Sequence, residues 1–269
     1  MAALALFTQH ALGLPIEPRA PLLVFVSTLF IYNLDHVIDT QVQRIPEEKA
    51  QAFFSRPGTL VLLVTAAIAT GLLAGSAPLS AKVVFASYTV VGLLYGLPLF
   101  PWTRDGRAVR LRLKDVPHLK AWGVSAAITL GAVGLPLTWS GRALDGGVWA
   151  FALFVYVLVV TNAHMFDVRD IASDRANRMT TLPVAVGVRR AKLAVIAMNL
   201  VVLALMSWGW ATELTRANPE IVLTIAAAVL YVLFIRVDTP RTYYGIVVDG
   251  CSYVPMVLVL GHKAFDALT

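Results

Sequence analysis

The sequence predicts an all-α membrane protein in which about nine transmembrane helices form one bundle. Of its 269 residues, 58% are apolar and only 14% are charged, and the mean hydropathy is +0.73. Soluble domains carry about a quarter charged residues and disordered chains carry fewer apolar ones, so this composition excludes both classes. Long apolar runs recur, each close to the roughly 20 residues that cross a hydrocarbon core of about 30 Å. We therefore expect a single transmembrane domain over residues 1–269.

The apolar runs place the helices in order. The first, residues 3–14, is shorter than a full span, and it lacks the basic start and the small-residue cleavage site of a signal peptide. Eight longer runs follow, and we expect each to be helical because lipid offers the backbone no hydrogen-bond partners. These runs lie at residues 20–38, 58–77, 78–100, 117–138, 146–166, 190–212, 219–236 and 242–262.

Basic residues are concentrated in alternate loops of this arrangement. The loops that follow the second, fourth, sixth and eighth spans hold 3, 6, 6 and 2 Lys or Arg, which is 17 of the 22 in the chain. The opposite loops hold the other five, which are Arg19, Lys82, Arg142, Arg216 and Lys263. Because cytoplasmic loops of membrane proteins carry the excess of Lys and Arg, the rich side is predicted to be cytoplasmic. We expect an integral protein of a bacterial or archaeal inner membrane.

Net charge and cysteine content narrow the possible partners. The net charge of +6 would suggest nucleic acid in a soluble protein. In a membrane protein the location of the basic residues matters more than their sum, so we expect the lipid bilayer and no nucleic acid as a partner. The single cysteine, Cys251, excludes an internal disulfide and a metal site built from cysteines.

Two acidic clusters lie on the basic side, each at the end of an apolar run. Residues 33–39 read Asn-Leu-Asp-His-Val-Ile-Asp, and residues 167–174 read Asp-Val-Arg-Asp-Ile-Ala-Ser-Asp. Each contains Asp-x3-Asp, and residues four apart share one face of a helix. Two such carboxylates repel each other unless a cation lies between them, and carboxylate oxygens suit Mg²⁺ together with substrate phosphates. The two pairs predict a cage for a metal-bound diphosphate, and ordinary solvated loop residues are the simpler alternative.

The loop that follows residue 100 carries six basic residues, which are suited to neutralise a departing diphosphate. Arg104 and Arg107 fit an ordinary role in setting topology. Lys114 and Lys120 lie nearer the start of the next apolar run. For these two lysines, contact with the diphosphate and a purely topological role are equally open.

Along nearly its whole length the chain resembles the UbiA superfamily of intramembrane prenyltransferases. The resemblance rests on Asp35 and Asp39, on Tyr95-Gly-Leu-Pro98 with Leu113-Lys114 and Pro117-His-Leu-Lys120, and on Asn162, residues 167–175, Thr181-Leu-Pro-Val184 and Gly187. In one departure, Ile31 and Tyr32 stand where the first family motif has Asn and Asp. The resemblance implies a UbiA-like bundle of nine helices around a central cavity. It also implies two Asp-rich motifs that bind Mg²⁺ and an isoprenyl diphosphate.

Each candidate residue has an expected role, and the resemblance implies these roles for all of them except Asn33 and Arg178. The candidate metal ligands are Asp35, Asp39, Asp170 and Asp174. The candidate catalytic residues are Lys114, Lys120, Tyr95 and Asp167. The candidate substrate-binding residues are Asn33, Arg44, Lys114, Lys120, Asn162 and Arg178.

The function expected from these residues is Mg²⁺-dependent transfer of an isoprenyl group from an isoprenyl diphosphate to an aromatic or other lipophilic acceptor. A terpene cyclase of the same fold is the first alternative, since there the cation is attacked by its own double bonds. An ion-coupled transporter is the second. Transporter sites are expected near the bilayer midplane, whereas both Asp pairs lie at the cytoplasmic surface, so the transporter is the weaker interpretation.

Overall fold

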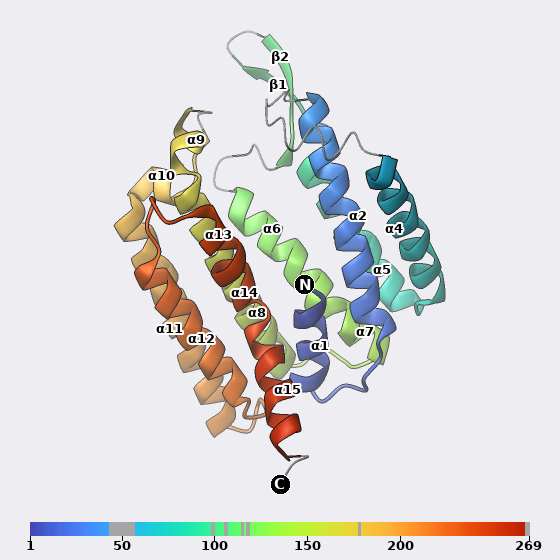
Figure 1. Ribbon diagram of the computed structural model, residues 1–269. Helices are drawn as coiled ribbons and strands as arrows, with labels where there is room; N and C mark the ends of the chain where they lie inside the picture. Colours follow the sequence, from blue (N-terminus) through green and yellow to red (C-terminus); the bar gives the residue numbers. More distant parts are fainter. Residues whose placement is uncertain are drawn as a thin grey trace.

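The computed structural model describes residues 1–42, 57–97, 100–104, 107–113, 116, 119–176 and 179–266, most of which lie in helices packed side by side (Figure 1). The first part of the chain contains α1 (Ala2–Ala11), α2 (Arg19–Val42), α4 (Pro57–Ser76) and α5 (Leu79–Gly96). The middle part contains β1 (Phe100–Arg104), β2 (Arg107–Leu111), α6 (Leu119–Thr129), the π-helix η2 (Leu130–Gly134), α7 (Leu135–Ser140) and α8 (Gly146–Arg169). The last part contains α9 (Ile171–Ala176), α10 (Leu182–Val186), α11 (Val188–Ala211), α12 (Pro219–Phe234), α13 (Arg241–Tyr243), the π-helix η3 (Tyr244–Val248), α14 (Asp249–Cys251) and α15 (Val254–Asp266).

The lengths and apolar character of the described helices give five or six candidate membrane crossings. Among the described residues, five helices are long and apolar enough to cross a membrane, and they become six if the two parts of residues 241–266, bent by 59°, form one broken span. The five are α4, α5, the continuous helix Leu119–Ser140, α8 and α11. The helix α12 is apolar but has only 16 residues, and α1 has only ten. A helical membrane bundle is therefore confirmed, while the count of nine crossings stays a prediction.

The most buried of the candidate spans is α8, and α4 lies at the periphery. In α8, 61% of the most apolar window is buried, against 11% in α4. Phe151, Phe154 and Leu158 of α8 are fully buried and belong to the main hydrophobic core. Leu72 of α4 and Leu79 of α5, by contrast, are 73% and 77% exposed. Apolar faces of this kind are stable only against lipid or another apolar partner.

A β-hairpin replaces part of the basic loop that is predicted after residue 100. The strands β1 and β2 pair antiparallel, with Phe100 opposite Leu111 and Arg104 opposite Arg107. The helix α5 ends at Gly96, four residues before the predicted end. Leu97 is extended, with φ −82° and ψ 134°, as expected for a residue that precedes proline. The sequence carries a signal for this hairpin that was not used in the prediction. Asp105-Gly106 stands between the two strand sequences, and Asp-Gly favours two-residue hairpin loops.

The connections divide between the two ends of the bundle (Figure 1). At one end lie the hairpin, α9, α10 and the ends of α2, α5, α8 and α12. We call it the basic end, because the four loops rich in Lys and Arg leave from it. The α1–α2, α7–α8 and α11–α12 connections and the C-terminus lie at the opposite end. The alternation of basic loops predicted from the sequence is thus an alternation between two ends of one bundle.

Candidate active site at the basic end of the bundle

The two predicted Asp clusters lie at the same end of the fold. Asp35 lies near the C-terminal end of α2, and residues 167–174 run from the last turn of α8 into α9. The end of α5 and the start of α6, which carry Tyr95 and Lys120, lie at that end as well. The structure therefore gathers the helix ends that carry the sequence-predicted chemistry.

Lys120 is the residue around which the second Asp cluster is organised. Its ammonium Nζ lies 3.3 Å from Oδ1 of Asp167 and 3.3 Å from Oδ1 of Asp174. The two carboxylates lie seven residues apart, which is two helical turns, and only 2% and 6% of these residues is exposed. Buried carboxylates require a partner of opposite charge, and Lys120 is that partner for both.

Two further side chains support this ion pair. The hydroxyl of Thr181 donates to Oδ2 of Asp174 at 3.2 Å, and Nδ1 of His164 lies 3.4 Å from Oδ2 of Asp167. Burial raises the pKa of the Asp174 carboxyl above its ordinary value, and the Lys120 ammonium opposes this shift. Neither His164 nor Thr181 is among the candidate site residues predicted from the sequence, although Thr181 belongs to a motif that carries the family resemblance. The position of His164 one turn before Asp167 was the available signal.

Its spacing pairs Asp170 with Asp174, but in the structure the partner of Asp170 is Arg169. The Arg169 guanidinium donates to both of its carboxylate oxygens, at 2.8 Å and 2.7 Å. This guanidinium also lies over the rings of Phe166 and Tyr244, with its Cζ at 4.8 Å and 5.7 Å from the ring centroids. In this structure, Asp174 thus shares a cation with Asp167, whereas Asp170 is held by its own neighbour.

Asp35 of the first cluster approaches the end of α5 closely. A Cβ placed on Gly96 would lie 2.3 Å from Oδ1 of Asp35, so only glycine leaves room for this carboxylate. Next to Gly96, the hydroxyl of Tyr95 donates to the backbone carbonyl of Lys120 at 3.4 Å. A continuous path therefore leads from the first Asp cluster through the end of α5 to Lys120 and the second cluster.

Of the remaining candidates, Asn33 and Asn162 form hydrogen bonds within the fold, and the others lie outside the described residues. Asn33 donates to the Leu29 carbonyl of its own helix at 2.7 Å. Asn162 donates to Ser252 Oγ at 2.9 Å and accepts a hydrogen bond from the Tyr231 hydroxyl, so it ties α8 to α12 and to the bend between α14 and α15. Outside the described part of the chain lie Arg44, Lys114, Arg178 and the side chain of Asp39. Among the described side chains, no group of three or more His, Cys, Asp or Glu is placed to hold a metal ion.

The chain is similar to one protein family and to solved structures of it. A profile of the UbiA prenyltransferase family matches residues 32–243. The apo UbiA homologue from Aeropyrum pernix K1 has a TM-score of 0.68 and 14% identity, covering 97% of this chain and 96% of that one. The Archaeoglobus fulgidus UbiA homologue bound to GPP and Mg²⁺ has a TM-score of 0.61 and 14% identity, covering 96% of this chain and 94% of that one. The homologue from the same organism bound to DMAPP and Mg²⁺ also has a TM-score of 0.61 and 14% identity, covering 96% of this chain and 93% of that one. No curated protein matches the chain.

The fold and the site define an integral membrane protein, a helical bundle with buried carboxylates and a shared cation at its basic end. The family match spans most of the chain and includes both Asp clusters, since it begins at residue 32 within α2 and extends past α8 and α9. The chain belongs to the UbiA prenyltransferase family. The resemblance identified from the sequence is thereby confirmed, and the structural neighbours share the fold.

Proposed function

We propose that this protein is a Mg²⁺-dependent intramembrane prenyltransferase that moves an isoprenyl group from an isoprenyl diphosphate to a lipophilic acceptor. Membership of the UbiA family supports the reaction class. The Archaeoglobus fulgidus homologues bound to GPP or DMAPP with Mg²⁺ support the substrate class and the metal. The observation that carries the proposal is the position of Lys120, whose ammonium lies between two buried carboxylates at the basic end.

The carboxylates at this end fit a hard divalent cation. Asp167 and Asp174 already share one positive group, the Lys120 ammonium, which stands where a cation between carboxylates would lie. Mg²⁺ is commonly bound by one or two carboxylates together with substrate phosphates, so a complete cage of protein ligands is not required. The residues that we assign to hold it are Asp35, Asp39, Asp170 and Asp174, with Asp167 beside them. When bound, Mg²⁺ would supply positive charge to the diphosphate oxygens.

The lysines act on the leaving group. The bond between C1 of the isoprenyl group and the diphosphate oxygen breaks, and its electron pair leaves with the diphosphate. Positive groups aimed at that oxygen stabilise the transition state. The Lys120 side chain is 30% exposed, so a bound diphosphate can approach it. Tyr95 acts as a positioning residue, because its hydrogen bond to the Lys120 carbonyl fixes the start of α6 against α5.

The apolar interior protects the allylic cation that this cleavage leaves behind. Water would capture the cation, and a helical bundle with an apolar core keeps water away from it. A nucleophilic atom of the acceptor then forms the new bond to C1, and the acceptor loses a proton. The reaction therefore needs both a diphosphate at the basic end and an acceptor in reach of the cation.

Turnover with and without an acceptor tests the function. Purified protein is given C10 to C20 allylic diphosphates and Mg²⁺, first alone and then with a lipid extract that contains candidate acceptors. We expect diphosphate release only with the extract, together with a prenylated product. Release of a cyclic hydrocarbon without any acceptor would identify a terpene cyclase instead. Absence of diphosphate release under both conditions would contradict the proposed function.

Gly96 provides a test of the close approach between α2 and α5. Gly96→Ala places a methyl group 2.3 Å from Oδ1 of Asp35, so that carboxylate has to move. Displacements of about 1 Å at a catalytic centre can cost roughly 10²-fold, and we expect a loss in kcat of about that size. The matched control is Gly71→Ala in α4, where the added Cβ meets nothing within 4 Å. Equal activities of the two variants would contradict the role of Gly96.

The positive-inside rule gives a prediction of orientation. We expect the loops at residues 101–116 and 167–189 to face the cytoplasm. Single cysteines introduced there, in a Cys251→Ser background, should not react with a membrane-impermeant maleimide added to intact cells. A cysteine at Leu144, which is 62% exposed at the opposite end, should react and is the positive control. Rapid labelling of a cysteine in either basic loop would contradict the predicted cytoplasmic orientation.

A further inference from the structure

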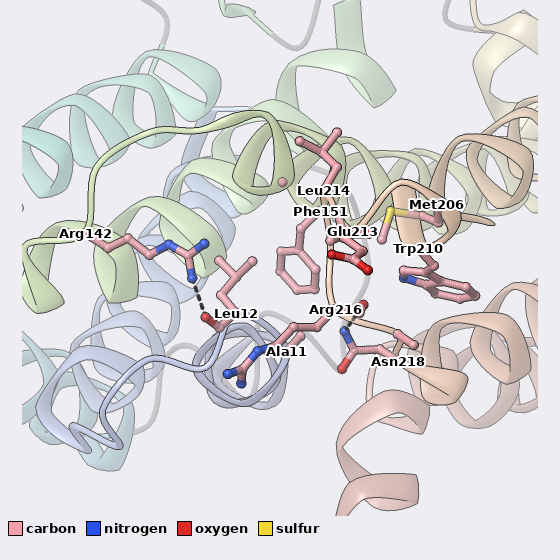
Figure 2. A pocket seen from close by; sticks show the side chains of 13 residues that line it. Ala11, Leu12, Arg142, Phe151, Met206, Trp210, Glu213, Leu214, Arg216 and Asn218 are labelled. Carbon is pink, nitrogen blue, oxygen red and sulfur yellow. Dashed lines mark hydrogen bonds between the residues drawn. The ribbon is translucent and has the colours of Figure 1, made fainter. Parts of the chain in front are cut away.

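A pocket lies at the end of the bundle opposite the Asp clusters. It has a volume of about 480 Å³ and lies between the ends of α1 and α11, the start of α8 and the loop that follows α11 (Figure 2). Leu12, Phe151 and Met206 supply apolar walls, while Trp210, Glu213 and Arg216 supply polar groups. The catalytic proposal uses none of these residues. A pocket with apolar walls and a few convergent polar groups is the usual form of a small-ligand site.

The pocket presents one uncommitted positive charge and one uncommitted negative charge. Arg142, which also lines it, is already engaged, because it donates to the Leu12 carbonyl and to Asp145, the latter at 3.0 Å (Figure 2). Within the part of the chain that the structure describes, Arg216 and Glu213 form no ion pair. With Arg142 neutralised by Asp145, the free charges of the pocket sum to zero. A ligand that satisfies both must carry charges of both signs.

Local backbone geometry holds the two charged residues in place. Gly13 has φ +61°, and a Cβ there would lie 2.5 Å from Nη1 of Arg216, so the guanidinium rests against the glycine. Glu213 has φ 59°, a left-handed conformation that non-glycine residues rarely adopt and that tends to occur at ligand sites. The indole Nε1 of Trp210 is buried and has no hydrogen-bond partner. A buried donor without a partner is uncommon in folded proteins, and this one belongs to a residue that lines the pocket.

Tryptophans place the pocket at the level of a membrane surface. Four of the six tryptophans lie in helix turns at this end, in the last turns of α7 and α11 and the first turn of α8. They are Trp139, Trp149, Trp208 and Trp210. Trp149 and Trp208 are 64% and 60% exposed on the outside of the bundle. Tryptophan gathers at the depth of lipid headgroups, so the pocket lies where headgroups are the most abundant charged molecules.

We propose that this pocket binds the headgroup of a zwitterionic membrane phospholipid, with the phosphate at Arg216 and the ammonium at Glu213. Charge-assisted hydrogen bonds from a guanidinium to a phosphate, and from an ammonium to a carboxylate, are the strong pairings for such groups. The apolar walls would take up the first carbons of the lipid. An anionic headgroup without an ammonium would leave Glu213 unpaired and close to a second negative charge. The inference does not depend on the proposed prenyl transfer.

Native mass spectrometry of the delipidated full-length protein tests the proposal. Three probes are titrated, namely phosphatidylethanolamine, phosphatidylglycerol with the same acyl chains, and glycerophosphoethanolamine, which has the headgroup without chains. We expect one phosphatidylethanolamine to bind most tightly. Arg216→Gln should weaken both lipids by about tenfold, since hydrogen bonds between charged groups are worth that much or more. Glu213→Gln should weaken phosphatidylethanolamine and remove the preference over phosphatidylglycerol.

Control variants separate this pocket from general attraction to the surface. Lys82→Gln removes an exposed cation at the same end but outside the pocket, and it should leave all three affinities unchanged. Arg216→Lys retains the charge and should retain most of the binding. Tighter binding of phosphatidylglycerol by the unaltered protein, or equal losses in Arg216→Gln and Lys82→Gln, would overturn the proposal. Equal affinity for the chain-free headgroup would identify a soluble zwitterion as ligand and would overturn the assignment to a lipid.

Discussion

Single Asp→Asn substitutions at the four assigned metal ligands are expected to abolish Mg²⁺-dependent turnover of an isoprenyl diphosphate. The positions are Asp35, Asp39, Asp170 and Asp174. Asparagine keeps the volume of the side chain but removes the charge that attracts the cation. Loss of one preorganised electrostatic donor costs about 10²–10³ in kcat, and loss of a metal ligand should cost at least that much. The measurement is diphosphate release at saturating substrate over a series of Mg²⁺ concentrations.

The control for this series is Asp266→Asn. Asp266 lies at the opposite end, with 65% of its side chain exposed, and its substitution should leave turnover unchanged. Thermal unfolding of each variant shows whether it still folds. Activities near that of the unaltered protein in two of the four site variants would contradict the metal assignment. Asp167→Asn completes the series, and we expect it to act through Lys120, by lowering kcat without raising the Mg²⁺ requirement.

The second large effect is expected at Lys114 and Lys120. If both contact the departing diphosphate, Lys114→Ala and Lys120→Ala should each lower kcat by roughly 10²–10³. Arg104→Ala and Arg107→Ala should change it little, since these arginines belong to the hairpin and set topology. Added Mg²⁺ should not restore the lysine variants, because their metal ligands are intact. Equal losses in all four variants, or no loss in any, would show that the loop is only a topology signal.

Lys120 has a structural role as well, and the experiment must distinguish this role from a role in catalysis. Its removal leaves Asp167 and Asp174 buried without their shared cation, so Lys120→Ala should also lower the Tm. Lys120→Arg retains the charge and should retain the stability. If only the loss of stability mattered, Lys120→Arg would be fully active. We expect it to be partly active, because a guanidinium places its charge differently from an ammonium.

Much of the bundle could be predicted from the sequence, because apolar length is a strong signal in a membrane protein. The run predicted at 146–166 lies inside α8, and the run at 58–77 coincides with α4 to within one residue at each end. Prediction failed where a local signal overrode the run of apolar residues. The run at 78–100 continues past Gly96, but Pro98 forces Leu97 into an extended conformation and ends the helix. The hairpin that follows has a turn signal of two residues, which is easily missed inside a basic loop.

The sequence indicates which residues belong to the candidate site, but it does not indicate which of them pair with one another. Spacing alone favours a pair of Asp170 with Asp174, which lie four residues apart. In the structure, Arg169 holds Asp170 because the two are adjacent where α8 ends, and Asp174 pairs with Asp167 through Lys120. Lys120 is 47 residues before Asp167 in the sequence, and no local pattern links them. Only the packing of α6 against α8 brings them together.

Equilibrium binding of a radiolabelled allylic diphosphate to the purified protein tests the central claim most directly. That claim is that the carboxylates at the basic end hold the diphosphate through Mg²⁺, before any acceptor or turnover is involved. Equilibrium dialysis should give one saturable site with Mg²⁺, and that binding should be lost in EDTA and in Asp174→Asn. The Asp266→Asn control should bind as the unaltered protein does. Equal binding with Mg²⁺ and with EDTA, or unchanged binding in Asp174→Asn, would contradict the account.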